Sequence, residues 1–525
     1  MKPVEALAVL LCAVIGVVLI GRRLKIPYPI ALVIGGLCIS LIPGLPVVRI
    51  DPEIIFLVFL PPLLYAAAWF TSWHDFKANL RPIFLLAVGL VLFTTLVVGW
   101  VVHALIPEIP LAIAFALGAI VSPPDAVAAT SIARQIGLPK RIVALLEGES
   151  LVNDATGLVA LRFAIVAAGS GEFSIAQASM EFLWVAAGGL ALGLIVGFLF
   201  ERAARLLKDD LLIVTLSLIA PYAAYLPAER LHLSGVLAVV AAGLYGGWKA
   251  PELITATVRL NAQAVWNLFV FLLNCVVFIL IGLQLPAVRA GIGHHTWSEL
   301  MLYGVIVSGV VILVRPLWVF PSAWLARLSK RVREKDPLPP WQHIAVVSWC
   351  GMRGVVSLAA ALALPMTLPG GQPFPERDLI LFLTFCVILA TLVLQGLSLP
   401  FVIRWLGVKR PRDGEQERRA RLKIAHAALA RLNKLAEERS VNESALGRVI
   451  NHYEDRIRHL NDSLAEILGW SPDREEFVAV RQLWREAFHA ERQELIGLRR
   501  TAQLDEELMH QIEHEIDLEE TKLGI

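Results

Sequence analysis

Long apolar runs follow one another through most of the chain, and this succession restricts what the chain can fold into more than any other feature. A transmembrane helix needs about 20 predominantly apolar residues. About thirteen runs approach or exceed that length: 4–21, 27–43, 52–70, 81–105, 109–131, 142–168, 176–206, 210–227, 231–248, 263–286, 298–326, 342–365 and 378–407. Only 18% of the residues are charged, whereas soluble globular chains carry about 25%. The sequence therefore predicts an all-α polytopic membrane protein.

The charged residues gather in the last part of the chain. Residues 408–525 are dense in Arg, Glu and Asp, and their apolar positions recur at helical spacing. We predict a transmembrane domain over 1–407 and a helical cytosolic tail over 408–525. A solvated bundle that aids assembly and a ligand-sensing domain both remain open for the tail. The net charge of +2 gives no indication of a nucleic-acid partner.

The cysteines give no sign of a metal centre. All five lie inside apolar runs and show no metal-ligand spacing, which is typical of cysteines that serve as small hydrophobic residues. Neither a resident metal nor a cofactor is predicted.

Basic residues in the short loops predict the orientation of the spans. Cytoplasmic loops carry an excess of Lys and Arg. Here basic loops follow the odd-numbered spans, whereas 44–51, 106–110 and 169–175 are nearly free of such residues. An odd number of spans then places the N-terminus outside the cell and the tail in the cytoplasm. The membrane we expect is the cell (inner) membrane.

Thirteen spans suggest an inverted repeat. We predict two halves of opposite topology, about 1–168 and 210–407, joined by the span 176–206. Transporters built from inverted repeats carry broken helices at corresponding positions of the two halves. The fifth span of each half is interrupted, by Ser122-Pro123-Pro124-Asp125 in one and by Gly351-Met352-Arg353-Gly354 in the other. We predict that these two broken helices cross.

The break in the first half has a defined consequence for the backbone. Because proline has no N–H, the carbonyls of Ala119 and Ile120 lose their helical partners and become available to a cation. Asp125 stands where a new helix begins, and the helix dipole favours a negative charge there. The alternative interpretation is a simple proline kink with Asp125 as its N-cap.

The run from Glu147 to Gly157 places carboxylates inside a span. A charged side chain at the bilayer centre costs about 2.5–3.5 kcal/mol on insertion scales. Residues three or four apart share a helix face, so Ser150, Asn153 and Asp154 form one stripe, and Glu149 points elsewhere. The role of Glu147 is left open.

Two arginines also lie within spans. Arg315 needs a partner, and Glu149 is the carboxylate that faces away from the stripe, so we predict a structural Glu149–Arg315 ion pair between the two halves. Arg353 lies between the glycines of the second break, near the middle of its span; the alternative for it is an arginine that snorkels to the interface.

Taken in order, these motifs resemble the cation/proton antiporter superfamily, specifically the sodium/proton exchanger branch. The resemblance covers all thirteen spans. The motifs that carry it are Leu60-Pro61-Pro62-Leu63-Leu64, Ser122-Pro123-Pro124-Asp125, Glu147-Gly148-Glu149-Ser150-Leu151-Val152-Asn153-Asp154, Arg315 and Gly351-Met352-Arg353-Gly354. It implies a homodimer in which a core domain moves against a dimerisation domain.

The resemblance also implies roles for particular residues. Asp154 matches the carboxylate that binds the cation or the proton, with Asp125 and Ser150 as further contributors to a Na⁺ site. Asn153 is placed in the same ion-binding site and matches the Asn of exchangers described as electroneutral, whereas electrogenic relatives have a second Asp there. Glu149 and Arg315 match a buried ion pair, and Arg353 matches an arginine near the crossing.

Two departures from the family pattern leave the ion preference open. Pro124 replaces a common Thr, so only a main-chain carbonyl is available there. The acidic residue or Asn that often follows the first Leu-Pro-Pro is replaced by Tyr65 and three alanines. An ion contact from that span is therefore missing or replaced.

The predicted function is secondary active transport, not enzymatic catalysis. The chain is expected to exchange Na⁺ for protons by alternating access, one for one, in the service of pH homeostasis. The alternatives are a K⁺/H⁺ antiporter or one with broad Na⁺, Li⁺ and K⁺ selectivity, an ion channel, and an integral-membrane enzyme. No nucleophile–base set or His-rich metal set near a membrane face supports an enzyme.

Overall fold

A computed structural model of the chain describes residues 3–42, 55–170, 175–207, 209–253, 256–290, 296–325, 338–368 and 372–408, and isolated residues or short stretches between 327 and 334 and between 422 and 518. The chain divides into two compact units, Met1–Arg410 and Pro411–Ile525. The predicted tail helices lie mostly outside the described residues.

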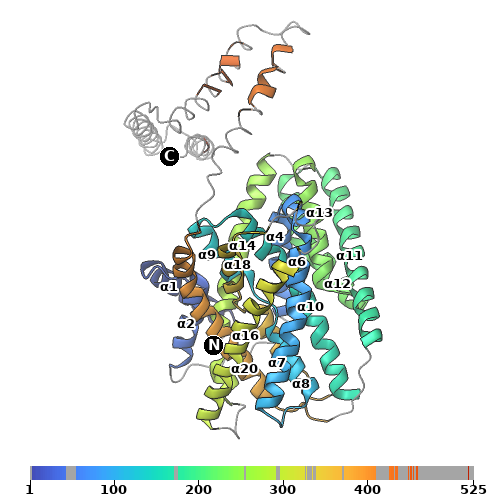
Figure 1. Cartoon of the computed structure of the whole chain (residues 1–525). Helices are drawn as coiled ribbons and strands as arrows, with labels where there is room; N and C mark the ends of the chain where they lie inside the picture. Colours follow the sequence, from blue (N-terminus) through green and yellow to red (C-terminus); the bar gives the residue numbers. More distant parts are fainter. Residues whose placement is uncertain are drawn as a thin grey trace. The chain divides into compact units, whose positions relative to one another are not determined.

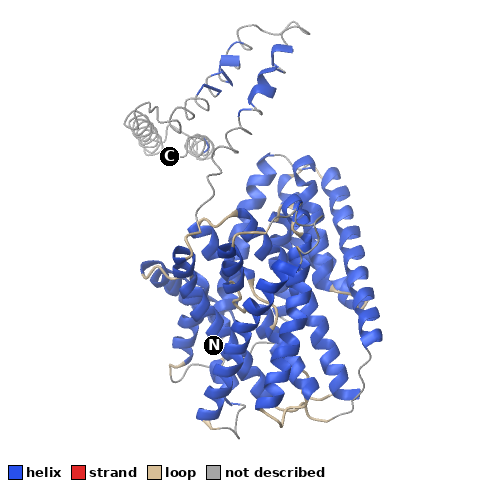
Figure 2. Ribbon diagram, in the orientation of Figure 1, coloured by secondary structure: helices blue, strands red, loops and turns tan. Residues whose placement is uncertain are grey.

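Helices account for nearly all of the described part of the first unit (Figure 2). The first half contains α1 (Pro3–Arg23), α2 (Tyr28–Ser40), η1 (Ile55–Phe59), α4 (Leu60–Phe70), α5 (Trp73–Ala78), α6 (Leu80–Phe84), η2 (Leu85–Leu90), α7 (Val91–Leu105), α8 (Leu111–Val121), α9 (Ala126–Ile136) and α10 (Lys140–Ser170). The remainder contains α11 (Ile175–Leu206), α12 (Asp210–Arg230), α13 (Gly235–Leu253), α14 (Ala256–Leu283), α15 (Leu285–Ala290), α16 (Trp297–Leu325), α18 (Trp341–Trp349), α19 (Val355–Leu362), α20 (Arg377–Ala390), η3 (Thr391–Gln395) and α21 (Gly396–Trp405).

The predicted spans coincide with these helices. Among the described residues, eight helices are long and apolar enough to cross a membrane, and shorter apolar helices cover Tyr28–Ser40, Phe56–Phe70 and Gly235–Ala250. Several predicted spans consist of two or three successive helices, such as α6, η2 and α7. The all-α polytopic fold is thus confirmed.

Both predicted breaks are present. α8 ends at Val121 and α9 begins at Ala126, while α18 ends at Trp349 and α19 begins at Val355. The residues between them are the Ser-Pro-Pro-Asp and Gly-Met-Arg-Gly motifs. The sequence located the breaks correctly because paired prolines and paired glycines both weaken helical hydrogen bonding.

Three π-helical segments were not predicted. η2 and η3 lie inside the spans Leu80–Leu105 and Arg377–Trp405, whereas η1 begins the described part of its span. Such segments often occur at functional sites. η3 begins at Thr391, whose hydroxyl accepts a hydrogen bond of 3.0 Å from the backbone N–H of Arg353. This π segment therefore positions a group at the second break.

Small residues allow the helices to approach one another closely. A Cβ added to Gly193 on α11 would collide with the backbone of Ala238 on α13, and one added to Gly36 on α2 would collide with the backbone of Ile279 on α14. Close packing at small residues is what drives helix association in lipid. α11, α12 and α13 pack together along one side of the unit (Figure 1).

Candidate ion-binding site

The two broken helices cross, and each satisfies the backbone that the other leaves open. The N–H of Asp125 donates to the carbonyl of Met352 at 2.7 Å. In return, Nε of Arg353 donates to the carbonyl of Val121 at 2.9 Å. Irregular backbone is tolerated at membrane depth only where protein or a water-lined cavity surrounds it, and here the crossing itself supplies the partners.

The carboxylate of Asp125 lies at the N-termini of two helices. Its Oδ1 accepts a hydrogen bond of 2.8 Å from the N–H of Val127 on α9, and the backbone of Val355, the first residue of α19, supplies another. Both helix ends carry a partial positive charge. Asp125 is therefore the N-cap that one interpretation expected, and it also lines the cavity described below.

Gly354 makes this arrangement possible because a Cβ at that position would overlap the Asp125 carboxylate. We expect Gly354→Ala to lower the melting temperature in detergent and to abolish transport, since overpacking costs about 1–3 kcal/mol and here displaces a charged group. Gly309→Ala is the matched control, because nothing lies within 4 Å of its Cβ position. A Gly354 variant as stable and active as the Gly309 variant would contradict this role.

Arg353 lies at the opposite helix ends. Its guanidinium donates to Val121, the last residue of α8, and to the carbonyl of Gly351, just beyond α18. The C-terminus of a helix favours a cation. Arg353 is 1% exposed, so the snorkelling alternative is wrong.

Contrary to the prediction, the residues whose carbonyls the prolines free do not line the cavity described below. The hydroxyl of Ser122 donates to the carbonyl of Ala119 at 3.0 Å, and neither Ala119 nor Ile120 lines the cavity. At Ala119 the hydroxyl of Ser122 takes the place of the N–H donor that the proline lacks.

A cavity of about 70 Å³ lies beside the crossing. Its polar lining comes from Asp125, Ser150, Asp154, Asn274 and Ser357. Asp154 is 5% exposed and interacts electrostatically with Asp125. The structure thus brings together three of the predicted ion-binding residues, which come from α10 and from the break between α8 and α9.

Two further residues of this cavity were not recognised as site residues in the sequence. Oδ1 of Asn274 on α14 and Oγ of Ser357 on α19 are buried without a hydrogen-bond partner in the described structure. A buried polar atom without a partner carries a desolvation penalty of about 1–3 kcal/mol. An oxygen that faces a cavity under these conditions is suited to bind a cation or a water molecule.

The side chain of Asn153, unlike that of its neighbour Asp154, does not reach the cavity. Its Nδ2 donates to the carbonyl of Pro124 at 2.9 Å, and it is not among the residues that line the cavity. Asn153 therefore braces the first break against α10. The sequence suggested the main-chain carbonyl of Pro124 as an ion contact in place of the usual Thr. In the structure this carbonyl accepts the hydrogen bond from Asn153.

Glu149 and Arg315 form the bidentate pair that the helix-face argument places between the halves. The distances are 2.6 Å from Nη1 to Oε1 and 2.7 Å from Nη2 to Oε2. Nε of Arg315 donates to the carbonyl of Val347 at 3.0 Å. Both side chains are buried, and the pair ties α10 to α16 and α18.

The chain matches a protein family described as "Sodium/hydrogen exchanger, transmembrane" over residues 7–405. It is 35% identical to an uncharacterised Na(+)/H(+) exchanger of Mycobacterium tuberculosis, over 99% of this chain and 96% of that protein. It is 36% identical to a sodium, potassium, lithium and rubidium/H(+) antiporter of Bacillus pumilus, over 87% of this chain and 69% of that protein.

The fold is similar to a solved structure as well. The sodium proton antiporter MjNhaP1 of Methanocaldococcus jannaschii, determined at pH 8, superposes with a TM-score of 0.62 at 20% identity. The match covers 77% of this chain and 99% of that one.

Proposed function

The chain belongs to the sodium/hydrogen exchanger family, and from that premise we propose that it exchanges monovalent cations for protons across the membrane by alternating access. The observation that carries the proposal is the cavity at the helix crossing, in which Asp154 and Asp125 lie among uncharged oxygen atoms. Hard monovalent cations prefer such oxygen ligands.

Competition for Asp154 provides the coupling. Burial disfavours the charged form of a carboxylate, whereas a nearby cation favours it. A site that holds either a proton or a cation, and opens alternately to each side, moves the two in opposite directions. Since Asn153 stands where a second carboxylate would otherwise adjoin Asp154, we propose one proton per cation and no net charge movement.

The cation we propose is Na⁺, held by Asp154, Asp125 and Ser150 with Asn274 and Ser357. Broader selectivity is the second candidate, because the Bacillus pumilus relative is named for sodium, potassium, lithium and rubidium. The missing acidic residue after Leu60-Pro61-Pro62 also favours it, since the cavity wall there consists of leucine and alanine.

We propose a homodimer in the cell membrane, with the N-terminus outside and the tail in the cytoplasm. The basic loops after odd-numbered spans support this orientation. Exposed apolar side chains on α11 such as Leu183 and Trp184 fit contact with lipid or with a second copy.

Removal of the uncharged cavity oxygens tests the ion site. We expect Asn274→Ala and Ser357→Ala each to raise the half-saturating Na⁺ concentration about ten-fold, because each removes an oxygen–cation contact that we take to be comparable to a hydrogen bond to a charged group, about 1.5–3 kcal/mol. Thr384→Val is the matched control: Thr384 Oγ1 is also buried without a partner in the described structure, but it lies outside the cavity. Equal effects in all three variants would contradict the assignment.

The transport proposal itself is tested in proteoliposomes that contain the full-length protein and a pH-sensitive dye. An imposed Na⁺ gradient should drive protons in the opposite direction, and K⁺ and Li⁺ gradients report the selectivity. Proton flux that does not respond to any of these cations would exclude the proposed function.

A further inference from the structure

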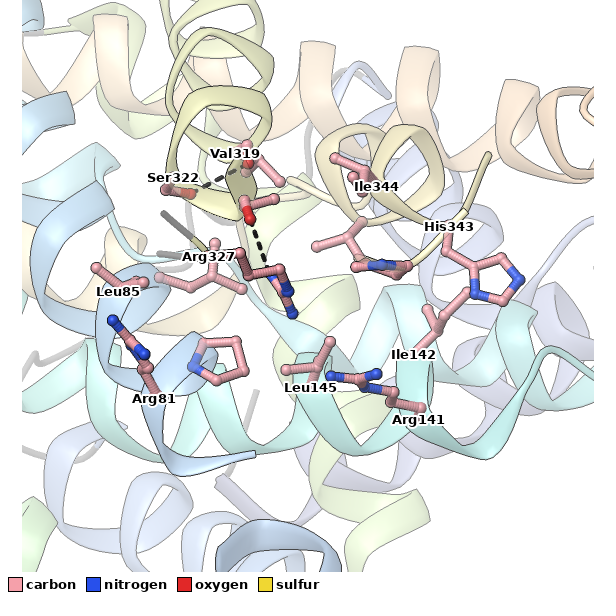
Figure 3. Close-up of a pocket in the computed structure, with 15 residues that line it drawn as sticks. Arg81, Leu85, Arg141, Ile142, Leu145, Val319, Ser322, Arg327, His343 and Ile344 are labelled. Atoms are coloured by element: carbon pink, nitrogen blue, oxygen red, sulfur yellow. Dashed lines mark hydrogen bonds between the residues drawn. The ribbon is translucent and has the colours of Figure 1, made fainter. Parts of the chain in front are cut away.

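Two groups of helices can be distinguished by how they pack. α4, α11, α12 and α13 pack mainly against one another, and we call them the α12 group. α7, α8, α9, α10 and α16 pack together with α6, η2 and α18, and we call them the α10 group. Within the α10 group, Leu85 of η2, Leu145 of α10 and Val319 of α16 line a cavity of about 80 Å³ (Figure 3). α10 therefore packs in one body with η2, α16 and α18.

The ion cavity lies at the boundary between these groups. Its lining includes Leu60, Leu64 and Ala67 of α4 as well as Ser150 and Asp154 of α10. An ion site at such a boundary opens alternately to the two membrane faces when one group of helices rocks or slides against the other. Polar contacts across the boundary are then made in one conformation and broken in the other.

One ion pair crosses this boundary away from the cavity. Nη2 of Arg162 on α10 lies 3.2 Å from Oε2 of Glu229 on α12. Arg162 follows Asp154 by about two helical turns, which is about 12 Å along the axis of α10. A displacement of a few ångströms between the two groups would exceed hydrogen-bonding distance and would separate the two charges.

The carboxylate of this pair is fixed to its own group. Oε1 of Glu229 accepts a hydrogen bond of 3.3 Å from the N–H of Gly235, which is the first residue of α13. The N-terminus of a helix favours a negative charge at this point. Glu229 can therefore keep this partner in both conformations, whereas its bond to Arg162 depends on the position of α10.

We propose that the Arg162–Glu229 ion pair is a latch, which favours the conformation described here over the one in which the ion cavity opens to the other membrane face. The inference rests on the alternating access proposed above and names a contact that sets the balance between the two conformations. The two side chains are 55% and 36% exposed. Because exposed pairs contribute modestly, loss of the pair should change the equilibrium between conformations by up to about five-fold. A contact of this strength biases the balance without trapping the transporter.

The experiment measures the distance between the two groups by electron spin resonance on the full-length protein in lipid bilayers. Spin labels are attached to Leu96→Cys on α7 and Leu190→Cys on α11, two exposed positions. The native cysteines that a label could reach are Cys12, Cys38 and Cys386, and these are first replaced by alanine.

Four variants separate a latch from a general effect of charge. Arg162→Gln and Glu229→Gln each remove one charge of the pair, and the glutamine at 229 keeps an oxygen for the N–H of Gly235. Arg162→Lys keeps the positive charge. Arg205→Gln is the matched control, because the side chain of Arg205 is 54% exposed but its partner Glu201 lies on the same helix.

We expect the population at the distance of the described structure to fall in Arg162→Gln and Glu229→Gln, with the ratio of the two populations changed by up to about five-fold. The change should be smaller in Arg162→Lys and absent in Arg205→Gln. In oriented proteoliposomes, the half-saturating Na⁺ concentration should rise on one membrane face and fall on the other, because apparent affinity scales with the fraction of the competent conformation.

Distances that stay the same in both Arg162→Gln and Glu229→Gln would overturn the latch, and so would an equal shift in Arg205→Gln. The distance measurement does not require transport. If the wild type failed to couple Na⁺ to protons while the distances still shifted as expected, the proposed function would fail and the latch would stand.

Discussion

Replacing Asp154 by asparagine is expected to reduce cation-driven proton flux to the rate of protein-free vesicles. Asn has nearly the same shape as Asp but neither titrates nor carries charge, so the site loses both its proton and its anionic ligand. Asp154 is buried beside a cavity whose other carboxylate, Asp125, is already hydrogen-bonded to two helix N-termini. We therefore expect no neighbouring group to substitute for it.

The variant must remain folded for this result to be informative. Size-exclusion profile and melting temperature should match those of the wild type, since neutralising a buried carboxylate removes a desolvation cost. Asp378→Asn, on the half-exposed first turn of α20, is the matched control and should transport normally. Robust Na⁺-driven flux in the Asp154 variant would exclude Asp154 as the coupling residue.

Replacing Glu149 by alanine is expected to have the largest effect on stability. The change leaves the guanidinium of Arg315 buried without its carboxylate, and breaking a buried pair in this way costs about 3–5 kcal/mol. The melting temperature in detergent should fall strongly, whereas the relative rates with Na⁺, K⁺ and Li⁺ should stay the same, because Glu149 does not line the ion cavity.

An exposed ion pair that links α10 to another helix provides the control. Arg162 on α10 pairs with Glu229 on α12 at 3.2 Å, with both side chains partly in contact with solvent or lipid. Surface pairs contribute about 0.2–1 kcal/mol, so Arg162→Ala should barely change the melting temperature. If Glu149→Ala instead shifted selectivity at an unchanged melting temperature, Glu149 would belong to the ion site.

The crossing of the broken helices was predictable because its signals are local and strong. Paired prolines at Pro123 and Pro124 cannot continue a helix, and the glycines around Arg353 weaken one. The pairing of Glu149 with Arg315 was also accessible, since a buried charge requires an opposite one and helix geometry separates Glu149 from the Asp154 stripe.

The remaining features depend on contacts that no short stretch of sequence contains. Asn274 and Ser357 are single polar residues in apolar spans, and such residues are usually hydrogen bonders between helices. Only the packing of α14 against α19 brings their oxygens to one cavity. The Asn153–Pro124 hydrogen bond likewise could not be predicted, because the sequence does not reveal how close α10 lies to the first break.

The geometry also suggests how the site moves as one body. Asp125 and Arg353 are each held by both broken helices, and Asn153 ties α10 to the same crossing. A site built in this way is suited to shift relative to other helices without changing its own ligands, as alternating access requires. Coupling then depends on what Asp154 carries in each position.

The most direct test of this account is the simultaneous measurement of Na⁺ uptake and proton release by wild-type proteoliposomes, with the membrane voltage clamped at zero and then imposed in either direction. We predict one proton released for each Na⁺ taken up and the same rate at every voltage. Na⁺ uptake without proton release, or a rate that follows the imposed voltage, would contradict exchange at a single carboxylate.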